Sequence, residues 1–208
     1  EKLRRDAGEK WRIRGEGSDF DHPACCLLSN GVYSIMSTEF GLTASACRDT
    51  LIYDTPDIPA QGGHGLELTL ALGGGETSLL PVPGRTDEEV LWELSEDSVS
   101  VLCRRAEFSA RCAVAAASGF SGEIRLVRLT ARVPMDGFVT LRFRPVLAAA
   151  DDYRSHPAFW RLGLEAREHQ GCLLLRRLAR GDRPEVWLAL ACASPMEFSA
   201  DAGGGLGW

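Results

Sequence analysis

Residues 27–38 read LLSNGVYSIMST, an Asn-Gly pair between two apolar stretches. Asn-Gly is typical of a tight β-hairpin, because both residues tolerate the positive φ that hairpin turns require. Asn30 is the only asparagine in the chain, and it falls where that geometry is needed. We therefore predict a hairpin from Leu27 to Met36, with Gly31 at positive φ.

Four later windows alternate apolar and polar residues, the pattern of half-buried strands. Their apolar positions are Leu66, Leu68, Leu70 and Leu72; Phe108, Ala110, Cys112 and Val114; Val139, Leu141 and Phe143; and Val186, Leu188, Leu190 and Cys192. A second hairpin is predicted at His169-Gln170-Gly171, and no window shows a sustained helical stripe. The sequence therefore predicts an all-β fold, a large two-layer antiparallel β-sandwich.

One predicted strand breaks the alternation. Residues 124–133 change phase near Leu126-Val127. A β-bulge would produce this pattern, and so would a strand that is covered on both faces.

The length and charge of the chain indicate how many domains it forms and which classes of partner it can bind. A chain of 208 residues with 45% apolar content can bury one large core, so we expect a single sandwich domain over residues 21–200. Residues 1–20 are expected to form an arm or a short helix, and the glycine-rich residues 201–208 a linker. The net charge of −6 and the scattered arginines argue against nucleic acid. No apolar stretch is long enough to span a bilayer, so no membrane contact is expected from this segment.

Seven cysteines are an odd number in a chain too long to depend on disulfides. No C-x-x-C or H-E-x-x-H spacing occurs, so neither a metal nor another cofactor is expected. Because most of the cysteines lie in apolar runs, we expect them to be reduced and to pack as small hydrophobic residues. A cytoplasmic location follows from that expectation.

Two blocks of sequence resemble one family. Residues 27–38 continue into Phe40–Asp49, and together they are similar to the L-L-S-N-G-x-Y-x-x-M segment and the following Arg-Asp of glycoside hydrolase family 94. Residues 147–159 resemble the stretch that ends in His-Pro-Ala-Phe in the glucan-synthase branch. The likeness is to the N-terminal sandwich (supersandwich) of these glycosyltransferase family 36-like proteins, in the group of cyclic β-1,2-glucan synthases and cellobiose phosphorylases.

This resemblance implies a galactose-mutarotase-like sandwich without catalytic residues, because the family's general acid lies in a C-terminal (α/α)₆ barrel. It also implies packing against that barrel, a homodimer and contact with a β-glucan oligosaccharide. The residues it marks as saccharide or loop-organising contacts are Asn30, Tyr33, Arg48, Asp49, Asp151 and His156. One departure from the family pattern is Gly41–Ser45, which replaces a Gly-Ser-Gly-Tyr-Ser stretch.

The residues themselves leave alternatives open. Arg48 and Asp49 can bind the hydroxyls of a sugar, or they can pair with each other across a loop. His156 can fix a loop with Asp151 or Asp152 as its partner, or it can contact a ligand.

The adjacent acidic pairs Glu88-Glu89 and Asp151-Asp152 would point to opposite faces of a strand, so neither forms an acid/base couple, and we expect both in solvated turns. The sequence is also compatible with two other functions, a stand-alone aldose-epimerase-like enzyme and a pure protein-interaction domain.

Overall fold

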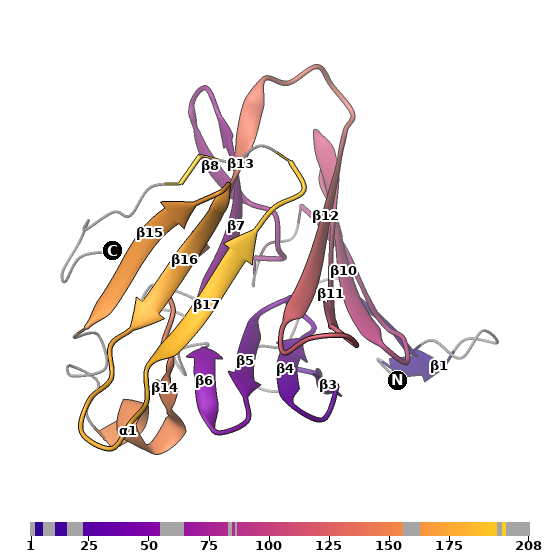
Figure 1. Ribbon diagram of the computed structural model, residues 1–208. Coiled ribbons are helices and arrows are strands. Elements are labelled where there is room, and N and C mark those ends of the chain that lie inside the picture. Colours follow the sequence, from indigo (N-terminus) through magenta and orange to yellow (C-terminus); the bar gives the residue numbers. More distant parts are fainter. Residues whose placement is uncertain are drawn as a thin grey trace. The chain divides into compact units, whose positions relative to one another are not determined.

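The structure is a computed structural model that describes residues 3–5, 11–15, 23–54, 65–82, 85, 87–155, 163–194 and 197–198. It confirms the all-β fold class: nearly every described element is a strand, and every strand pair is antiparallel (Figure 1). The chain divides into two compact units, whereas the sequence predicts one domain over residues 21–200. Unit 1 comprises residues 1–48 and 53–144, and unit 2 comprises residues 49–52 and 145–208.

Unit 1 is built on a six-stranded sheet in the order β1-β2-β9-β10-β11-β12. Its strands are β1 (Leu3–Arg5), β2 (Trp11–Gly15), β9 (Glu89–Leu94), β10 (Ser98–Arg104), β11 (Phe108–Ala116) and β12 (Glu123–Ala131). The segment expected to be an arm or a short helix therefore contributes two strands, because β2 pairs with β9 and β1 pairs with β2.

Smaller sheets form the second layer of unit 1. One contains β3 (Cys25–Ser29), β4 (Tyr33–Thr38) and β5 (Thr43–Cys47) side by side. The other has the order β13-β7-β8, with β7 (Leu66–Leu72), β8 (Gly75–Ser78) and β13 (Gly137–Phe143). The core lies between the layers, where alternate residues of each strand are buried, among them Ile35, Leu68, Leu70, Val99 and Val101.

Close packing between the layers is visible at Gly41. A Cβ atom placed on this residue would lie 2.8 Å from Cδ2 of Leu80 and 3.4 Å from Cγ2 of Val101. Its φ of 75° also falls in the region that favours glycine. Gly41 therefore allows the turn before β5 to approach the facing layer.

Both predicted hairpins are confirmed. Ser29 pairs with Ser34 across the first turn, and Gly31 has the expected positive φ, 89°. The expectation of positive φ at Asn30 is wrong, because this residue contributes to the turn through its side-chain hydrogen bonds instead. In the second hairpin, Gln170 and Gly171 have φ values of 50° and 76°, the combination that a two-residue type I′ turn requires. The turn chemistry of both hairpins is thus encoded locally.

Unit 2 contains β14 (Ala148–Ala149), which pairs with β6 (Thr50–Tyr53), the short helix α1 (Ala150–Ser155) and a three-stranded sheet. That sheet has the order β15-β16-β17, formed by β15 (Leu164–His169), β16 (Cys172–Arg177) and β17 (Val186–Ala191). Arg177 is buried and donates to the carbonyl of Leu147 at 2.9 Å. None of the described helices is long and apolar enough to cross a membrane.

The phase change predicted near Leu126-Val127 has a different cause from either expectation. β12 pairs with β11 in continuous register from Glu123 to Ala131, so there is no bulge. Ile124 and Leu126 are each 57% exposed, so the outer face of the strand is not covered. The alternation is obscured because two inner positions carry charged residues, Glu123 and Arg125, in place of apolar ones.

Candidate functional site

The most elaborate polar site in the described structure lies inside unit 1, where β12 faces β4, β5 and Tyr53 at the end of β6. Arg125 Nε donates to Glu123 Oε1 at 2.5 Å, with side chains 19% and 13% exposed. The Tyr53 hydroxyl accepts from Arg125 Nη2 at 2.5 Å and lies 3.0 Å from Glu123 Oε2, to which it donates. Two residues of one strand and a tyrosine of another are thus joined in a closed ring of hydrogen bonds.

Neighbouring strands complete this network. The buried Tyr33 hydroxyl lies 3.2 Å from Glu123 Oε2 and 2.8 Å from Ser45 Oγ. Thr43 Oγ1 accepts from Arg125 Nη2 at 2.8 Å. We call these side chains the Glu123 cluster; its members are Tyr33, Thr43, Ser45, Tyr53, Glu123 and Arg125. The cluster connects the two layers of unit 1, because β12 belongs to one layer and β4 and β5 to the other.

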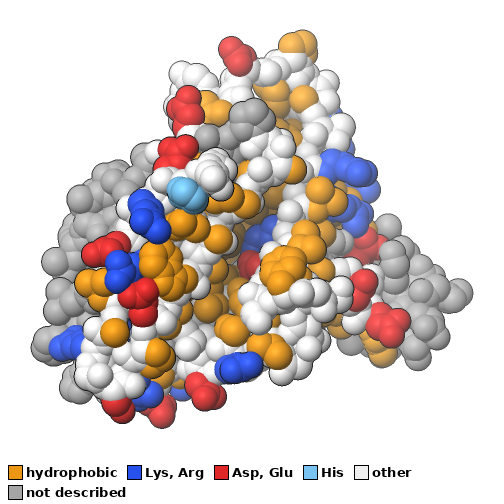
Figure 2. Space-filling view, viewed as in Figure 1, with side chains coloured by type: hydrophobic (Ala, Val, Ile, Leu, Met, Phe, Trp, Pro, Cys, Tyr) orange, Lys and Arg blue, Asp and Glu red, His pale blue; other side chains and the backbone are white. Residues whose placement is uncertain are grey.

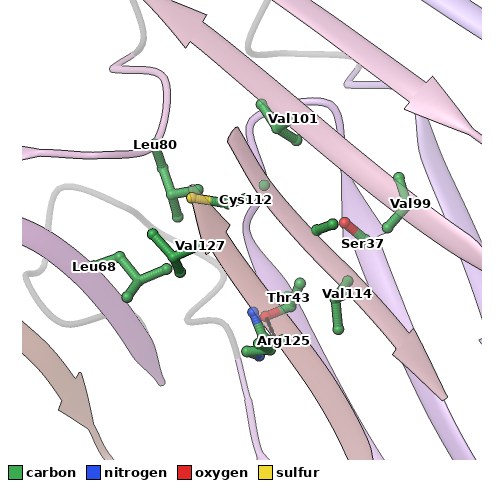
Figure 3. A pocket seen from close by; sticks show the side chains of 12 residues that line it. Ser37, Thr43, Leu68, Leu80, Val99, Val101, Cys112, Val114, Arg125 and Val127 are labelled. Carbon is green, nitrogen blue, oxygen red and sulfur yellow. Dashed lines mark hydrogen bonds between the residues drawn. The ribbon is translucent and has the colours of Figure 1, made fainter. Parts of the chain in front are cut away.

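The space beside the cluster is small. A cavity of about 20 Å³ is lined by Arg125 and Thr43 together with mostly apolar side chains from both layers (Figure 3). That volume accommodates about one water molecule, whereas ligand pockets usually measure about 300–1,000 Å³. The Glu123 carboxylate is therefore bound by three protein donors, and the cavity beside Arg125 is too small for a sugar ring.

Burial perturbs the tyrosines of the cluster. It raises the pKa of Tyr53 to about 12, with a further increase from Glu123 and an opposing effect of Arg125. Burial also raises the pKa of Tyr33, and the nearby Glu123 carboxylate adds to the increase. Both phenols are therefore neutral hydrogen-bonding groups at physiological pH.

These shifts predict loss of stability in alkali. Between the ordinary tyrosine pKa of about 10 and the folded value of about 12 for Tyr53, the unfolded chain releases a proton that the folded chain keeps. The free energy of unfolding should therefore fall as the pH rises through this interval. Urea denaturation at a series of pH values measures the slope. Tyr53→Phe should make this slope shallower. An unchanged slope would show that Tyr53 is not the source of the pH dependence.

A second buried ion pair lies elsewhere in unit 1. Arg105 and Glu88 meet at 2.8 Å with side chains that are each 2% exposed. Arg105 also donates to the Ser78 carbonyl at 2.5 Å, and the Val82 N–H donates to Glu88 at 2.8 Å. The expectation of a solvated turn at Glu88 is therefore wrong, because an arginine from β10–β11 neutralises it in the core. Glu89 does point to the other face, where it pairs with exposed Arg104.

Asn30 is the residue that organises its turn. Its Oδ1 accepts from the N–H groups of Val32 at 3.0 Å and Tyr33 at 2.7 Å. Its Nδ2 donates to the carbonyls of Ala117 at 2.6 Å and Phe120 at 3.1 Å, in the loop between β11 and β12. All the hydrogen-bonding capacity of this amide is used within unit 1, so Asn30 holds two loops together.

This geometry predicts that Asn30→Ala lowers the free energy of unfolding by about 1–3 kcal/mol, because backbone groups lose both their donor and their acceptor. Asn30→Asp keeps the acceptor oxygen but loses the donor to Ala117 and Phe120. If the acceptor bonds contribute more, it should lower the free energy of unfolding less than Asn30→Ala does. If the donor bonds contribute more, it should lower it by as much or more. Chemical denaturation of the three proteins measures the difference. A fully stable Asn30→Ala protein would contradict the role of this side chain.

Of the other predicted site residues, Tyr33 belongs to the Glu123 cluster, whereas Arg48, Asp49 and Asp151 do not. Tyr33 is 2% exposed, so it organises the core and offers no surface to a ligand. Arg48 and Asp49 are exposed in the turn after β5, and among the described residues neither side chain has an ion-pair partner. The Arg48 N–H donates to the Val32 carbonyl at 2.8 Å, which places this turn beside the one that Asn30 organises.

The remaining predictions concern the region around α1 and the end of the chain. Asp151 is exposed in the first turn of α1, and the neighbouring Asp152 pairs with Arg183 at 3.0 Å, so this acidic pair lies in a helix and not in a turn. His156 and the predicted linker at 201–208 lie outside the described residues.

The cysteines only partly match their expected packing. All seven are free thiols, but only Cys103 is buried, while Cys25 and Cys192 are exposed. Burial raises the pKa of the Cys103 thiol to about 12. No group of three or more potential metal ligands is found among the described residues.

The sequence does carry a signal for the Glu123 cluster. Glu123 and Arg125 occupy alternate positions of a predicted strand and therefore share a face with Val127 and Leu129. Two opposite charges on an otherwise apolar face indicate a buried ion pair. The tyrosine, serine and threonine partners lie in other strands, and their identity depends on the way the layers face each other.

Comparison with known proteins adds no family assignment: no family model matches this sequence, and no curated protein matches it significantly.

Proposed function

We propose that this chain is a non-catalytic β-sandwich domain of a cytoplasmic carbohydrate-active protein, with an architectural role and a surface that contacts saccharide. The proposal extends the resemblance to the family 94 sandwich. The observation that carries it is the Glu123 cluster, in which the carboxylate best placed for chemistry is bound by an arginine and two tyrosines beside a cavity of about 20 Å³. A carboxylate whose charge is neutralised in this way, and whose side chain is 13% exposed, has a structural role.

The arginine-aspartate turn is the part of the proposed saccharide surface that the resemblance marks. Arg48 and Asp49 are both exposed, and neither has an ion-pair partner among the described residues. A guanidinium and a carboxylate in this situation are free to hydrogen-bond the hydroxyls of a sugar.

An activity assay tests the non-catalytic role. We expect no phosphorolysis of cellobiose, no hydrolysis of β-1,2-glucan and no acceleration of glucose mutarotation by the purified chain. Glu123→Gln serves as the diagnostic variant, because it keeps the shape of the side chain and removes the charge. Turnover by the wild-type chain that disappears in a folded Glu123→Gln protein would overturn the proposal in favour of an epimerase-like enzyme.

A protein-interaction domain is the second candidate, and the outer side of β12 favours it. Phe120, Ile124 and Leu126 are 59%, 57% and 57% exposed, and Ile124 and Leu126 lie on one face of an edge strand. A second copy of the chain or a helical barrel of the parent protein would bury them. Sedimentation of the wild type and of an Ile124→Ser, Leu126→Ser protein tests this candidate. A monomer in both cases would exclude self-association through β12.

A further inference from the structure

The three-stranded sheet of unit 2 has two unlike faces. One carries apolar residues at alternate positions, with Leu175 buried. The register places Glu165, Arg176 and Trp187 opposite one another on the other face, and Arg167 follows Glu165 on the same side of β15. In Figure 2, hydrophobic, basic and acidic side chains lie next to one another over these strands. The second face is therefore mixed in character.

Trp187 is the centre of this face. It is 47% exposed, a large fraction for an indole ring. Its Nε1 donates to the carboxylate of Glu185, and the guanidinium groups of Arg167 and Arg176 each lie 5.2 Å from the ring centroid. These contacts hold the indole in one orientation before any ligand arrives, which reduces the entropy lost on binding.

The charges around the ring balance. Arg176 lies 2.6 Å from Glu185 and 3.6 Å from Glu165. Arg167 adds a second positive charge, so two arginines and two glutamates surround one aromatic ring. A neutral ligand complements this face better than a phosphate or an acidic polymer, because neither sign of charge is in excess.

A pyranose ring has the matching chemistry. Its C–H face is apolar and can lie on an indole, while its hydroxyl groups both donate and accept around the edge of the ring. Guanidinium groups donate and carboxylates accept, and both form stronger hydrogen bonds than neutral groups do. A protein partner would need a wider apolar centre than one ring within a border of charges.

We propose that the exposed face of the β15–β16–β17 sheet binds a neutral β-linked oligosaccharide, with one sugar ring on Trp187 and its hydroxyls bonded by Arg167, Arg176, Glu165 and Glu185. The choice of a carbohydrate rests in part on the proposed function. The site is new to that function, because the resemblance marks none of these five residues as a saccharide contact.

Titration calorimetry with β-1,2- and β-1,4-linked gluco-oligosaccharides tests this site, with oligogalacturonate as the charged probe. We expect Trp187→Ala to weaken binding of the neutral glucan by about tenfold or more, since truncating a central tryptophan removes most of a contact surface. Phe138→Ala is the matched control, because Phe138 is 69% exposed on β13 of unit 1. It should leave the affinity unchanged.

Fluorescence gives an independent readout on the folded protein. Binding should change the emission of the wild type, and this change should be much smaller in Trp187→Phe, which keeps a flat ring. Equal affinities of wild type and a folded Trp187→Ala protein would overturn the site while leaving the proposed saccharide role intact. Absence of glucan binding by the wild type would overturn both, and stronger binding of oligogalacturonate would overturn the neutral ligand.

Discussion

Arg105→Met should lower the free energy of unfolding by about 3–5 kcal/mol, the largest effect that we expect from any single substitution in unit 1. The side chains of Arg105 and Glu88 are each 2% exposed, so the substitution leaves a carboxylate buried without its cation. Methionine preserves much of the volume, which restricts the loss to the charge and its hydrogen bonds. Urea denaturation monitored by circular dichroism measures the change.

An exposed ion pair next to Arg105 and Glu88 in the sequence serves as the control. Arg104 and Glu89 also form an ion pair, at 2.9 Å, but their side chains are 39% and 51% exposed. Arg104→Met should therefore cost less than about 1 kcal/mol. Adding Glu88→Gln to Arg105→Met should recover part of the loss, because the buried group is then neutral. Equal costs for Arg104→Met and Arg105→Met would show that burial does not determine the strength of these pairs.

The second large effect is expected at the Glu123 cluster. Arg125→Met should lower the free energy of unfolding by about 2–4 kcal/mol, less than at Arg105 because the pair is partly exposed. It should also raise the pKa of Tyr53 further, since the guanidinium is the group that opposes the effect of burial. Chemical denaturation and the alkaline ultraviolet titration of tyrosine measure these two consequences separately.

Arg128 provides the control on the same strand. It points to the exposed outer face of β12, so Arg128→Met should change stability by no more than about 0.5 kcal/mol and leave the tyrosine titration as it is. If Arg125→Met behaved in the same way, the cluster would not be the connection between the layers that we describe.

Local sequence predicted the elements whose geometry is set by neighbouring residues. The positive φ of Gly31 and of Gly171 follows from the residue type, and Asn30 is a residue whose side chain commonly bonds the backbone of its own turn. Leu66, Leu68 and Leu70 are buried as their alternation predicts. These features need no knowledge of the rest of the chain.

Features that depend on distant strands were predicted poorly. The charged residues 1–14 resemble an arm, yet β2 forms because β9 offers it a partner, and strand formation depends strongly on such context. Glu88 appeared solvated because its cation, Arg105, comes from a later segment. Tyr33 was expected to be a saccharide or loop-organising contact, and only the packing of β12 onto β4 shows that its hydroxyl is used inside the core.

Trp187 falls between these cases. The alternation of Val186, Leu188 and Leu190 already places it on the opposite face of β17. Its arginine neighbours lie on β15 and β16, and the register of the sheet brings them to the ring. The sequence could therefore predict an exposed tryptophan but not the balanced charges around it.

One experiment tests the central claim, that the chain binds saccharide without transforming it. Saturation-transfer difference NMR of the chain with a β-linked gluco-oligosaccharide reports contact and chemistry in the same sample. We predict transfer to the C–H protons of the sugar, with anomeric signals whose intensities follow those of a protein-free sample over a day. New reducing-end signals, faster interconversion of the anomers or the absence of any transfer would contradict the account.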